Sequence, residues 1–356
     1  MLSDVGSLAR HRAYLGKPCK KGSVEPFPCD PAKIFKMQVD GLAKRLKAIR
    51  CKDVVIGLSG GLDSTLALLV CGGAFEKLGL DRKGIHVYTM PGFGTSKRTK
   101  GNAESLCEGL GLALETISIV KSVRQHLRDI GHDGRTPDVT YENAQARMRT
   151  LILMDKANMT GGIVIGTGDL SEIALGWCTY NGDHMSMFAV NNDVPKTVVR
   201  KVCRWWADRN LRPGAGDHGS RTAAAAILDV IATPVSPELV KGQVTEDSLG
   251  PYELHDFFLW NFIVNEMGSK DLLAAAERYF GGSAAESGGG TKERADSAPR
   301  LRFSTSTISK TLEIFMRRFF TQAFKRNCQP DGIKVFPFEL SLRDWWIPSD
   351  LGPIKI

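Results

Sequence analysis

The stretch Val54-Val55-Ile56-Gly57-Leu58-Ser59-Gly60-Gly61-Leu62-Asp63-Ser64 joins a short apolar run to a glycine-bearing polar turn. Residues 54–58 predict a buried strand, and the apolar pattern from Ser64 to about Leu78 predicts a helix. Glycines in the intervening turn permit positive φ and let the backbone approach an anion, while the N–H groups at the helix start supply hydrogen-bond donors. The stretch therefore predicts a strand–loop–helix unit that binds phosphate.

Three side chains of this turn indicate which phosphate ligand it would hold. Ser59 and Ser64 add hydroxyl donors, whereas Asp63 would repel bare phosphate unless Mg²⁺ lies between them. The turn lacks the Gly-Lys-Ser/Thr ending of a Walker A loop. The structural alternative is a glycine turn capped by Asp63 or Ser64, and the order of strand, loop and helix favours phosphate binding over it.

Strands and helices continue to alternate along the chain. Short apolar runs that predict strands follow at 85–89, 114–119 and 163–167. Helical patterns occupy 34–49, 100–110, 143–158, 197–210, 223–231 and 306–325. This alternation indicates an α/β fold of Rossmann-like type, with a parallel sheet covered by helices on both faces. In such sheets, ligands bind beyond the carboxyl ends of the strands.

Composition and charge restrict the class of protein. Of the 356 residues, 42% are hydrophobic and 24% are charged, and no apolar run approaches the roughly 20 residues of a membrane helix. The N-terminal residues lack the order of a secretory signal, so we expect a cytoplasmic protein without a membrane partner. The net charge of +8 suits nucleotide phosphates as well as nucleic acid. Because Lys and Arg are scattered without interleaved aromatics, we expect no nucleic-acid partner. The eight cysteines include no Cys-x-x-Cys pair, which favours free thiols.

A second group of polar and aromatic side chains follows the predicted strand at 163–167. Glu172 lies where it could share a metal ion with Asp63, because both residues come shortly after the carboxyl end of a strand. Trp177 and Tyr180 offer flat faces on which a ring could stack. Either aromatic residue, taken alone, could instead belong to the core.

Several separated segments resemble the synthetase domain of glutamine-dependent NAD synthetases, which are N-type ATP pyrophosphatases of the PP-loop superfamily. Besides residues 57–64 and 166–185, the matching segments are Pro91-Gly92-Phe93-Gly94-Thr95, Tyr141-Glu142-Asn143-Ala144-Gln145-Ala146-Arg147, Val194-Pro195-Lys196-Thr197, Ser236-Pro237-Glu238-Leu239, Gly250-Pro251-Tyr252-Glu253-Leu254-His255-Asp256-Phe257-Phe258 and Phe324-Lys325-Arg326-Asn327-Cys328. The resemblance implies the adenine nucleotide alpha hydrolase-like variant of the α/β fold. It divides the chain into an arm at 1–30, a synthetase domain at 31–350 and a tail at 351–356. Polar composition predicts mobile loops at 212–221 and 283–302.

The resemblance implies a role for each matching residue. It implies ATP binding for Gly57, Leu58, Ser59, Gly60, Gly61, Leu62, Asp63, Ser64, Thr167 and Lys196. It implies deamido-NAD binding for Asn143, Glu172, Trp177, Cys178, Thr179, Tyr180, Asp183 and Lys325. Asp63 and Glu172 match Mg²⁺ ligands, and Lys196 matches a lysine that faces the nucleotide phosphates; these three are the implied catalytic residues. The alternative for Lys196 is an ordinary surface lysine.

The implied activity is that of an ATP-dependent amide-forming ligase, an NAD synthetase. The nicotinate carboxylate of deamido-NAD would attack the α-phosphorus of ATP, and ammonia would convert the resulting acyl-adenylate to NAD and AMP. The resemblance also implies a homodimer. One alternative is another PP-loop adenylating enzyme, such as one that thiolates tRNA, although the sequence shows neither a catalytic cysteine pair nor an RNA-binding domain. A second is a catalytically degenerate nucleotide-binding subunit, against which the intact Asp63, Glu172 and Lys325 argue.

The chain departs from the family pattern in two respects. Glutamine-dependent members carry an N-terminal nitrilase-like glutaminase domain, and this sequence offers neither the length nor the Glu-Lys-Cys set of that domain. We therefore expect an enzyme that uses ammonia; a subunit fed by a separate glutaminase and a fragment of a longer chain are the alternatives. Residues 336–346 and the 283–302 segment also differ from the family, which leaves the closing lid and the oligomer contacts open.

Overall fold

The computed structural model describes residues 26–214, 216–236, 239, 244–281 and 302–341. Its centre is a five-stranded sheet in the order β3-β2-β1-β4-β5, and every neighbouring pair of strands is parallel. The strands are β1 (Val54–Gly57), β2 (Ile85–Thr89), β3 (Leu114–Thr116), β4 (Ile163–Gly166) and β5 (Phe188–Ala189). The predicted α/β fold with a parallel sheet is confirmed. Because the chain builds outward from β1 in both directions, β1 and β4 flank a topological switch point.

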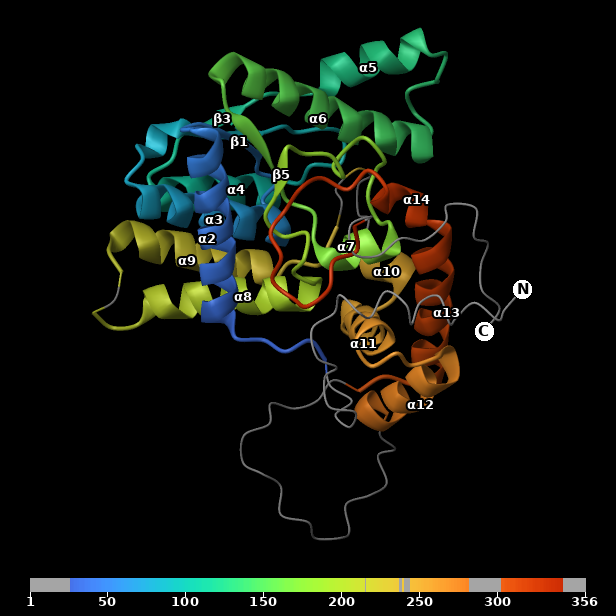
Figure 1. Cartoon of the computed structure of the whole chain (residues 1–356). Coiled ribbons are helices and arrows are strands. Elements are labelled where there is room, and N and C mark those ends of the chain that lie inside the picture. Colours follow the sequence, from blue (N-terminus) through green and yellow to red (C-terminus); the bar gives the residue numbers. More distant parts are fainter. Residues whose placement is uncertain (1–25, 215, 237–238, 240–243, 282–301, 342–356) are drawn as a thin grey trace.

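Helices cover both faces of the sheet (Figure 1). One face packs against α6 (Val139–Thr160), which contacts α5 (Val120–Asp129). The other carries α2 (Pro31–Ile49), α3 (Leu62–Leu78), α4 (Lys97–Leu110), α8 (Lys196–Leu211) and α9 (His218–Ile231). Val54 and Ile56 of β1 join the same apolar cluster as α3, whereas Val55 joins the cluster that includes Ala157 of α6. Burial on both faces is the reason that β1 reads as an unbroken apolar run.

The remaining helices form a second group beside the sheet. They are α7 (Leu170–Leu175), α10 (Thr245–Leu249), α11 (Tyr252–Ile263), α12 (Ser269–Phe280), α13 (Thr305–Thr321) and α14 (Ala323–Arg326). Both α11 and α13 contact α7, and aromatic rings pack between them, such as Phe258 and Phe315 with centroids 5.9 Å apart. Apolar packing of this group thus fixes α7, which follows β4 directly. Within the described part of the chain, no helix is long and apolar enough to cross a membrane.

Several helix ends follow signals in the sequence. Pro31 occupies the first turn of α2, and the side chain of Asp30 accepts a hydrogen bond from the Lys33 N–H. Asp169 and Glu172 form a capping box at the start of α7, in which each side chain accepts a backbone N–H of the other residue. This box determines where the Glu172 carboxylate lies relative to the end of β4.

The structure corrects some predicted boundaries. The strand predicted at 114–119 ends at Thr116, because α5 begins at Val120. Residues 218–221, predicted to belong to a loose stretch at 212–221, form the first turn of α9, which the side chain of Asp217 caps. The helix predicted at 306–325 is divided at Gln322 into α13 and α14.

The strand β5 and the helix α11 are among the elements that were not predicted from the sequence. The strand β5 has two residues, and α11 is buried around nearly its whole circumference, so it lacks a polar face. The predicted arm at 1–30 and loop at 283–302 lie almost entirely outside the described residues, and the tail at 351–356 lies wholly outside them.

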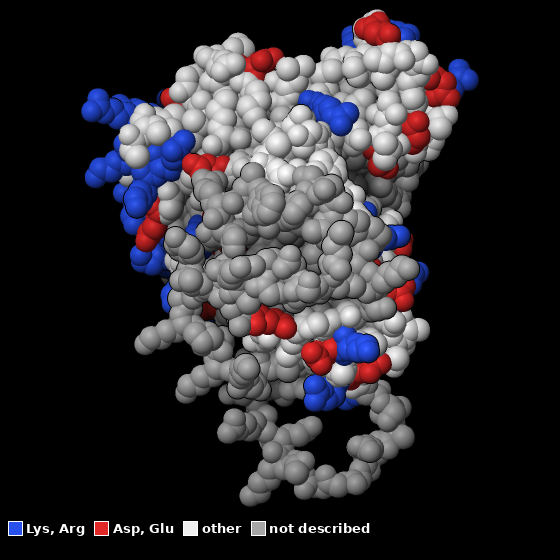
Figure 2. All heavy atoms as spheres, turned by 45° about the vertical axis from the view of Figure 1, so that its right-hand side comes forward, with Lys and Arg blue, Asp and Glu red and all other residues white. Residues whose placement is uncertain are grey.

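The positive charge of the chain lies partly on solvated helix faces. Four lysines of α2 are exposed, namely Lys33, Lys36, Lys44 and Lys47. Figure 2 shows Lys and Arg gathered along one edge of the visible face, with both signs of charge mixed elsewhere. Part of the net charge of +8 is therefore accounted for by an ordinary solvated surface.

Candidate active site

A cleft of about 580 Å³ opens at the switch point between β1 and β4. Its walls include every site residue predicted from the sequence except Lys196 and Tyr180. The residues from Gly57 to Ser64 form one wall, Thr167 and Glu172 follow β4 on the other, and Lys325 comes from the distant α14. The predicted phosphate loop and the predicted deamido-NAD residues thus share one continuous cavity.

The phosphate loop has a conformation that requires glycine. Gly60 has φ of +83°, and a Cβ at this position would lie 2.0 Å from the Thr99 carbonyl oxygen. The Ser59 hydroxyl accepts a hydrogen bond of 3.1 Å from the Gly61 N–H, which tightens the turn. No side chain caps the start of α3 among the described residues, so the first N–H groups of this helix are open to an anion.

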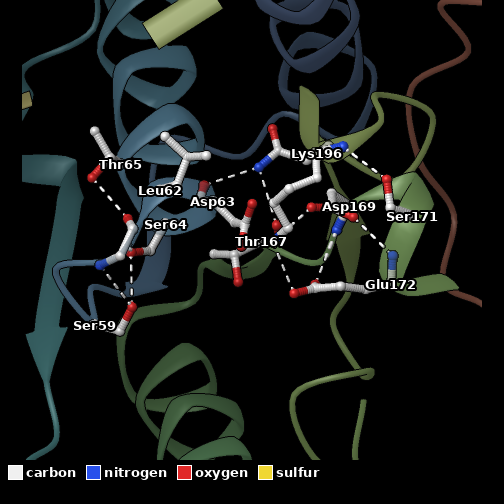
Figure 3. A network of polar contacts seen from close by, with 12 residues as sticks. Ser59, Leu62, Asp63, Ser64, Thr65, Thr167, Asp169, Ser171, Glu172 and Lys196 are labelled. Atoms are coloured by element: carbon white, nitrogen blue, oxygen red, sulfur yellow. Dashed lines mark hydrogen bonds and ion pairs between the residues drawn. The ribbon is translucent and has the colours of Figure 1, made fainter. Parts of the chain in front are cut away.

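Beside the loop, one ammonium group is surrounded by three carboxylates (Figure 3). The Lys196 Nζ lies 2.5 Å from Asp63 Oδ2, 2.7 Å from Asp169 Oδ2 and 2.9 Å from Glu172 Oε1. The lysine side chain is 1% exposed. We call these four residues the carboxylate–lysine cluster. With all four groups ionised, its charge is −2, which a bound cation would reduce.

Burial and mutual charge shift the pKa values within this cluster. Burial raises the pKa of Glu172 to about 7, with Asp63 adding repulsion and Lys196 opposing the rise. Burial likewise raises the pKa of Asp169. Burial alone would lower the pKa of Lys196, but the three surrounding carboxylates outweigh it and hold the ammonium protonated.

The cluster fits a Mg²⁺ site formed by Asp63 and Glu172. Their side chains are 21% and 19% exposed and both line the cleft, whereas Asp169 is 0% exposed and caps α7. Carboxylate oxygens of all three residues lie within 4.8 Å of one another. Asp63 Oδ1 has no hydrogen-bond partner in the described part of the protein. Hard oxygen ligands with a free lone pair suit Mg²⁺.

The structure decides between the two expectations for Lys196 only in part. The alternative of an ordinary surface lysine is wrong, because the side chain is 1% exposed. The expectation that it faces the nucleotide phosphates stays a prediction: its ammonium contacts Asp63 and Glu172, which line the cleft, although Lys196 itself does not line it. A buried ammonium needs anionic partners, and here Asp63, Asp169 and Glu172 provide them.

The far part of the cleft contains most of the predicted deamido-NAD residues. Thr179 connects two of them, since its hydroxyl donates to Asn143 Oδ1 at 2.7 Å and its N–H donates to Asp183 Oδ1 at 2.8 Å. Lys325 Nζ donates to the carbonyl oxygens of Gly176 and Cys178 at 2.8 and 2.6 Å. These contacts fix the loop that follows α7 to α14.

The two predicted aromatic residues of this region have different surroundings. Trp177 lines the cleft, but the guanidinium of Arg318 lies 5.0 Å from its ring centroid. Tyr180 does not line the cleft. Its ring stacks on His184 with centroids 5.4 Å apart, and its hydroxyl lies 3.2 Å from Cys328 Sγ. The contact of Tyr180 with deamido-NAD stays a prediction.

Cys178 lines the cleft without the environment of a reactive thiol. Burial raises its pKa, and the nearby Asp183 adds to the rise. The ammonium of Lys325 lowers the pKa of the thiol, but burial also lowers the pKa of Lys325 itself. Cys178 is thus suited to contact a ligand as a neutral side chain.

The structure brings further residues into the site that the sequence patterns did not single out. Asp169 belongs to the carboxylate–lysine cluster, and the Asp-x-x-Glu spacing of a capping box would have revealed it. Glu142, Arg149 and Arg318 line the cleft, and no local pattern marks them. Arg149 reaches it from α6, where its Nε donates to the Met90 carbonyl oxygen at 3.0 Å.

The fold and the cleft define the class of this protein. A parallel sheet with a glycine-bearing phosphate loop at its switch point, beside a carboxylate cluster, is the arrangement of a nucleotide-binding α/β protein of the PP-loop class. Comparisons with known proteins narrow this class to one family.

The family model for NAD synthase matches residues 34–278. The chain therefore belongs to the NAD synthase family. It is 39% identical over 348 residues to the glutamine-dependent NAD(+) synthetase of Mycobacterium tuberculosis H37Rv, an alignment that covers 92% of this chain and 50% of the relative. It is 33% identical over 257 residues to the glutamine-dependent NAD(+) synthetase of Thermotoga maritima, covering 70% of this chain and 41% of the relative. The chain thus spans about half the length of these curated relatives or less.

Solved structures share the fold. A glutamine-dependent NAD(+) synthetase from Cytophaga hutchinsonii has a TM-score of 0.67 at 17% identity, covering 90% of this chain and 54% of that one. An NMN synthetase from Francisella tularensis has a TM-score of 0.55 at 23% identity, covering 70% of this chain and 93% of that one. These likenesses support the predicted Rossmann-like α/β fold.

Proposed function

We propose that this chain is an NAD synthetase that adenylates the nicotinate carboxylate of deamido-NAD with ATP and amidates it with ammonia. The observation that supports the proposal is one continuous cleft lined by the phosphate loop, by the carboxylates of Asp63 and Glu172, and by the predicted deamido-NAD residues of its far part. The two reacting molecules can therefore meet without leaving the protein. Membership of the NAD synthase family and the named activity of the relatives support the same reaction.

In the first step, a carboxylate oxygen of deamido-NAD attacks the α-phosphorus of ATP, and pyrophosphate leaves. The N–H groups at the start of α3 bind the phosphates and hold them in line. When bound, Mg²⁺ supplies positive charge to the departing pyrophosphate, and Asp63 and Glu172 are the residues that hold it. Lys196 keeps both carboxylates in place through its ammonium. The protein contributes mainly position and charge, as in phosphoryl transfer generally.

In the second step, ammonia attacks the acyl carbon, and AMP leaves with the oxygen that bridged carbon and phosphorus. Asn143, Thr179 and Asp183 provide a connected set of polar groups around the ring and its carboxyl group. Trp177, with Arg318 against its ring, forms the apolar wall that keeps water from the adenylate. Burial raises the pKa of Asp183, and the hydrogen bond from the Thr179 N–H opposes this rise.

Assembly and location complete the proposal. We infer that the protein is cytoplasmic and that it forms a homodimer. The homodimer is supported by apolar side chains that α6 exposes, Val139 at 69%, Leu151 at 55% and Met159 at 78%. Light scattering after size-exclusion chromatography tests the dimer, and a monomer at micromolar concentration would contradict it.

The activity is tested by incubating the purified chain with ATP, Mg²⁺ and deamido-NAD, with ammonium or glutamine supplied in parallel. We expect NAD and AMP in equal amounts with ammonium. Turnover with glutamine would indicate a nitrogen donor other than the ammonia we propose. Tight binding of ATP without any AMP would favour the alternative of a catalytically degenerate subunit.

A further inference from the structure

A buried asparagine outside the cleft touches both of its walls. Asn191 follows β5 and is 0% exposed. Its Nδ2 donates to the carbonyl oxygen of Asp63 at 2.9 Å and to that of Thr167 at 3.0 Å. Asp63 ends the phosphate loop, and Thr167 begins the segment that leads to Glu172. One amide group therefore bridges the two segments that supply the proposed Mg²⁺ ligands.

The orientation of this amide follows from its surroundings. Both carbonyl oxygens can only accept hydrogen bonds, so the amide nitrogen must face them. The Asn191 Oδ1 accepts a hydrogen bond of 2.9 Å from Gln38 Nε2, which also donates to the Val190 carbonyl oxygen at 2.9 Å. Gln38 lies on α2 and is 0% exposed as well. A chain of two buried amides thus runs from α2 to the walls of the cleft.

The bridge lies where the sheet no longer joins the two segments. The ladder between β1 and β4 pairs Val54 with Ile163 and Val55 with Val164, and it ends before either strand does. Beyond this point, Lys196 also links Asp63 to Glu172. That link is ionic, and a cation or phosphates in the cleft would redistribute it. The Asn191 amide is neutral and binds backbone atoms, so its geometry is independent of the charge in the cleft.

We propose that Asn191 is a positioning residue that fixes the separation between the phosphate loop and the Glu172 segment, and that Gln38 orients its amide. The inference rests on the proposed binding of ATP with Mg²⁺ between these segments. It predicts an effect on ATP affinity that loss of stability alone would not produce. The KM for deamido-NAD, whose proposed pocket is the far part of the cleft, should change much less.

The test compares Asn191→Leu with Asn261→Leu in the full chain. Asn261 is also a buried asparagine, and its Nδ2 donates to the Phe257 carbonyl oxygen at 2.8 Å, but it lies within α11 and outside the cleft walls. We expect both variants to melt at lower temperature. We expect Asn191→Leu, and not Asn261→Leu, to weaken the binding of ATP in the presence of Mg²⁺ about tenfold, because only Asn191 makes the two hydrogen bonds that join the walls of the cleft. The KM for deamido-NAD should stay within about twofold in both.

Calorimetric titration with ATP and Mg²⁺ separates the possible failures. Absence of ATP binding by the unaltered chain would count against the proposed function itself. The positioning role would be overturned if a folded Asn191→Leu variant binds ATP with the same Kd as the unaltered chain. It would also be overturned if this Kd rises no more than it does in Asn261→Leu. If Asn191→Leu does not fold, Gln38→Leu decides, since it leaves Asn191 intact but no longer oriented. We expect Gln38→Leu to raise the Kd for ATP about threefold, and an unchanged Kd would overturn the proposal.

Discussion

The two ends of the cleft are built by different kinds of contact. The carboxylate–lysine cluster consists of charged side chains that bind one another, with every Nζ–O distance between 2.5 and 2.9 Å. The proposed deamido-NAD pocket is held largely by side chains that bind backbone atoms, such as Lys325 on Gly176 and Cys178. Its parts come from α6, from the loop after α7 and from α14, which lie far apart in the sequence.

This difference predicts different responses to mutation. In the cluster, the charge of each group is balanced by its neighbours, so loss of one group shifts the pKa values of the others. In the pocket, loss of an uncharged side chain or of Lys325 changes a local shape and leaves the four groups of the carboxylate–lysine cluster in place. Substitutions in the cluster should therefore abolish the chemistry, whereas substitutions in the pocket should change the affinity for one substrate.

The largest effect is expected from Asp63→Asn and Glu172→Gln. Each change replaces a cleft-facing carboxylate by an amide of nearly the same size, and two carboxylates remain in contact with Lys196. We expect turnover to fall about a thousandfold or more, since charge stabilisation of the departing pyrophosphate is lost. Thermal melting should change little. The measurement is AMP formation with ATP, Mg²⁺ and ammonium, and normal turnover in either variant would rule out the metal assignment.

Lys196→Met should affect stability as well as turnover. It leaves three carboxylates without their ammonium, one of them on the fully buried Asp169. Removal of one partner from a buried ionic group typically costs about 3–5 kcal/mol of unfolding free energy. Urea denaturation measures this loss. Combining Lys196→Met with Asp169→Asn should restore part of the stability, and strict additivity of the two losses would show that the charges do not interact.

Lys325→Met tests the other end of the cleft. It removes the hydrogen bonds to the Gly176 and Cys178 carbonyl oxygens and frees the loop after α7. We expect the KM for deamido-NAD to rise about tenfold while the KM for ATP changes less than about twofold. Steady-state kinetics with each substrate varied in turn provides the measurement. An equal rise in both constants would remove the distinction between the two ends.

The smallest effect concerns a buried carboxyl group outside both regions. Asp193 Oδ2 accepts hydrogen bonds from the Val335 and Phe336 N–H groups at 2.5 and 2.7 Å, but burial still raises its pKa from 3.8 to about 8. Because the folded pKa is the higher one, its stabilising contribution is complete below about pH 4 and is lost as pH rises toward 8. Asp193→Asn should remove this dependence.

The variant should therefore gain stability relative to the unaltered chain between pH 5 and pH 8, by about 1 kcal/mol or more. Comparing differences between two pH values removes any constant cost of the asparagine amide. Urea denaturation at both pH values provides the measurement. Parallel stability–pH curves would show that Asp193 is ionised in the folded protein throughout this range.

The same comparison explains what the sequence could predict. The phosphate loop, β1 and Glu172 are signalled locally, by a glycine turn, an apolar run and the position after a strand. Their roles depend on a few neighbouring residues, so a single chain reveals them. Asn191 and Arg318 carry no such signal, because their partners lie more than 20 residues away and only the packed fold brings them together.

Lys196 and Tyr180 show a second limit. The resemblance identified both as site residues, but the direction of a side chain depends on what surrounds it. Three carboxylates hold the Lys196 ammonium beside the loop, and His184 with Phe324 holds the Tyr180 ring outside the cleft. Sequence position alone could not distinguish a residue in the wall of the cleft from one that supports it.

The central claim is that this cleft transfers the AMP part of ATP to a carboxylate oxygen. Deamido-NAD labelled with ¹⁸O in its nicotinate carboxylate, supplied with ATP, Mg²⁺ and ammonium, tests this claim directly through mass analysis of the AMP. If the carboxylate attacks the α-phosphorus and ammonia then breaks the bond between carbon and oxygen, each AMP must carry one ¹⁸O atom. AMP without the label, or ADP in its place, would contradict the account.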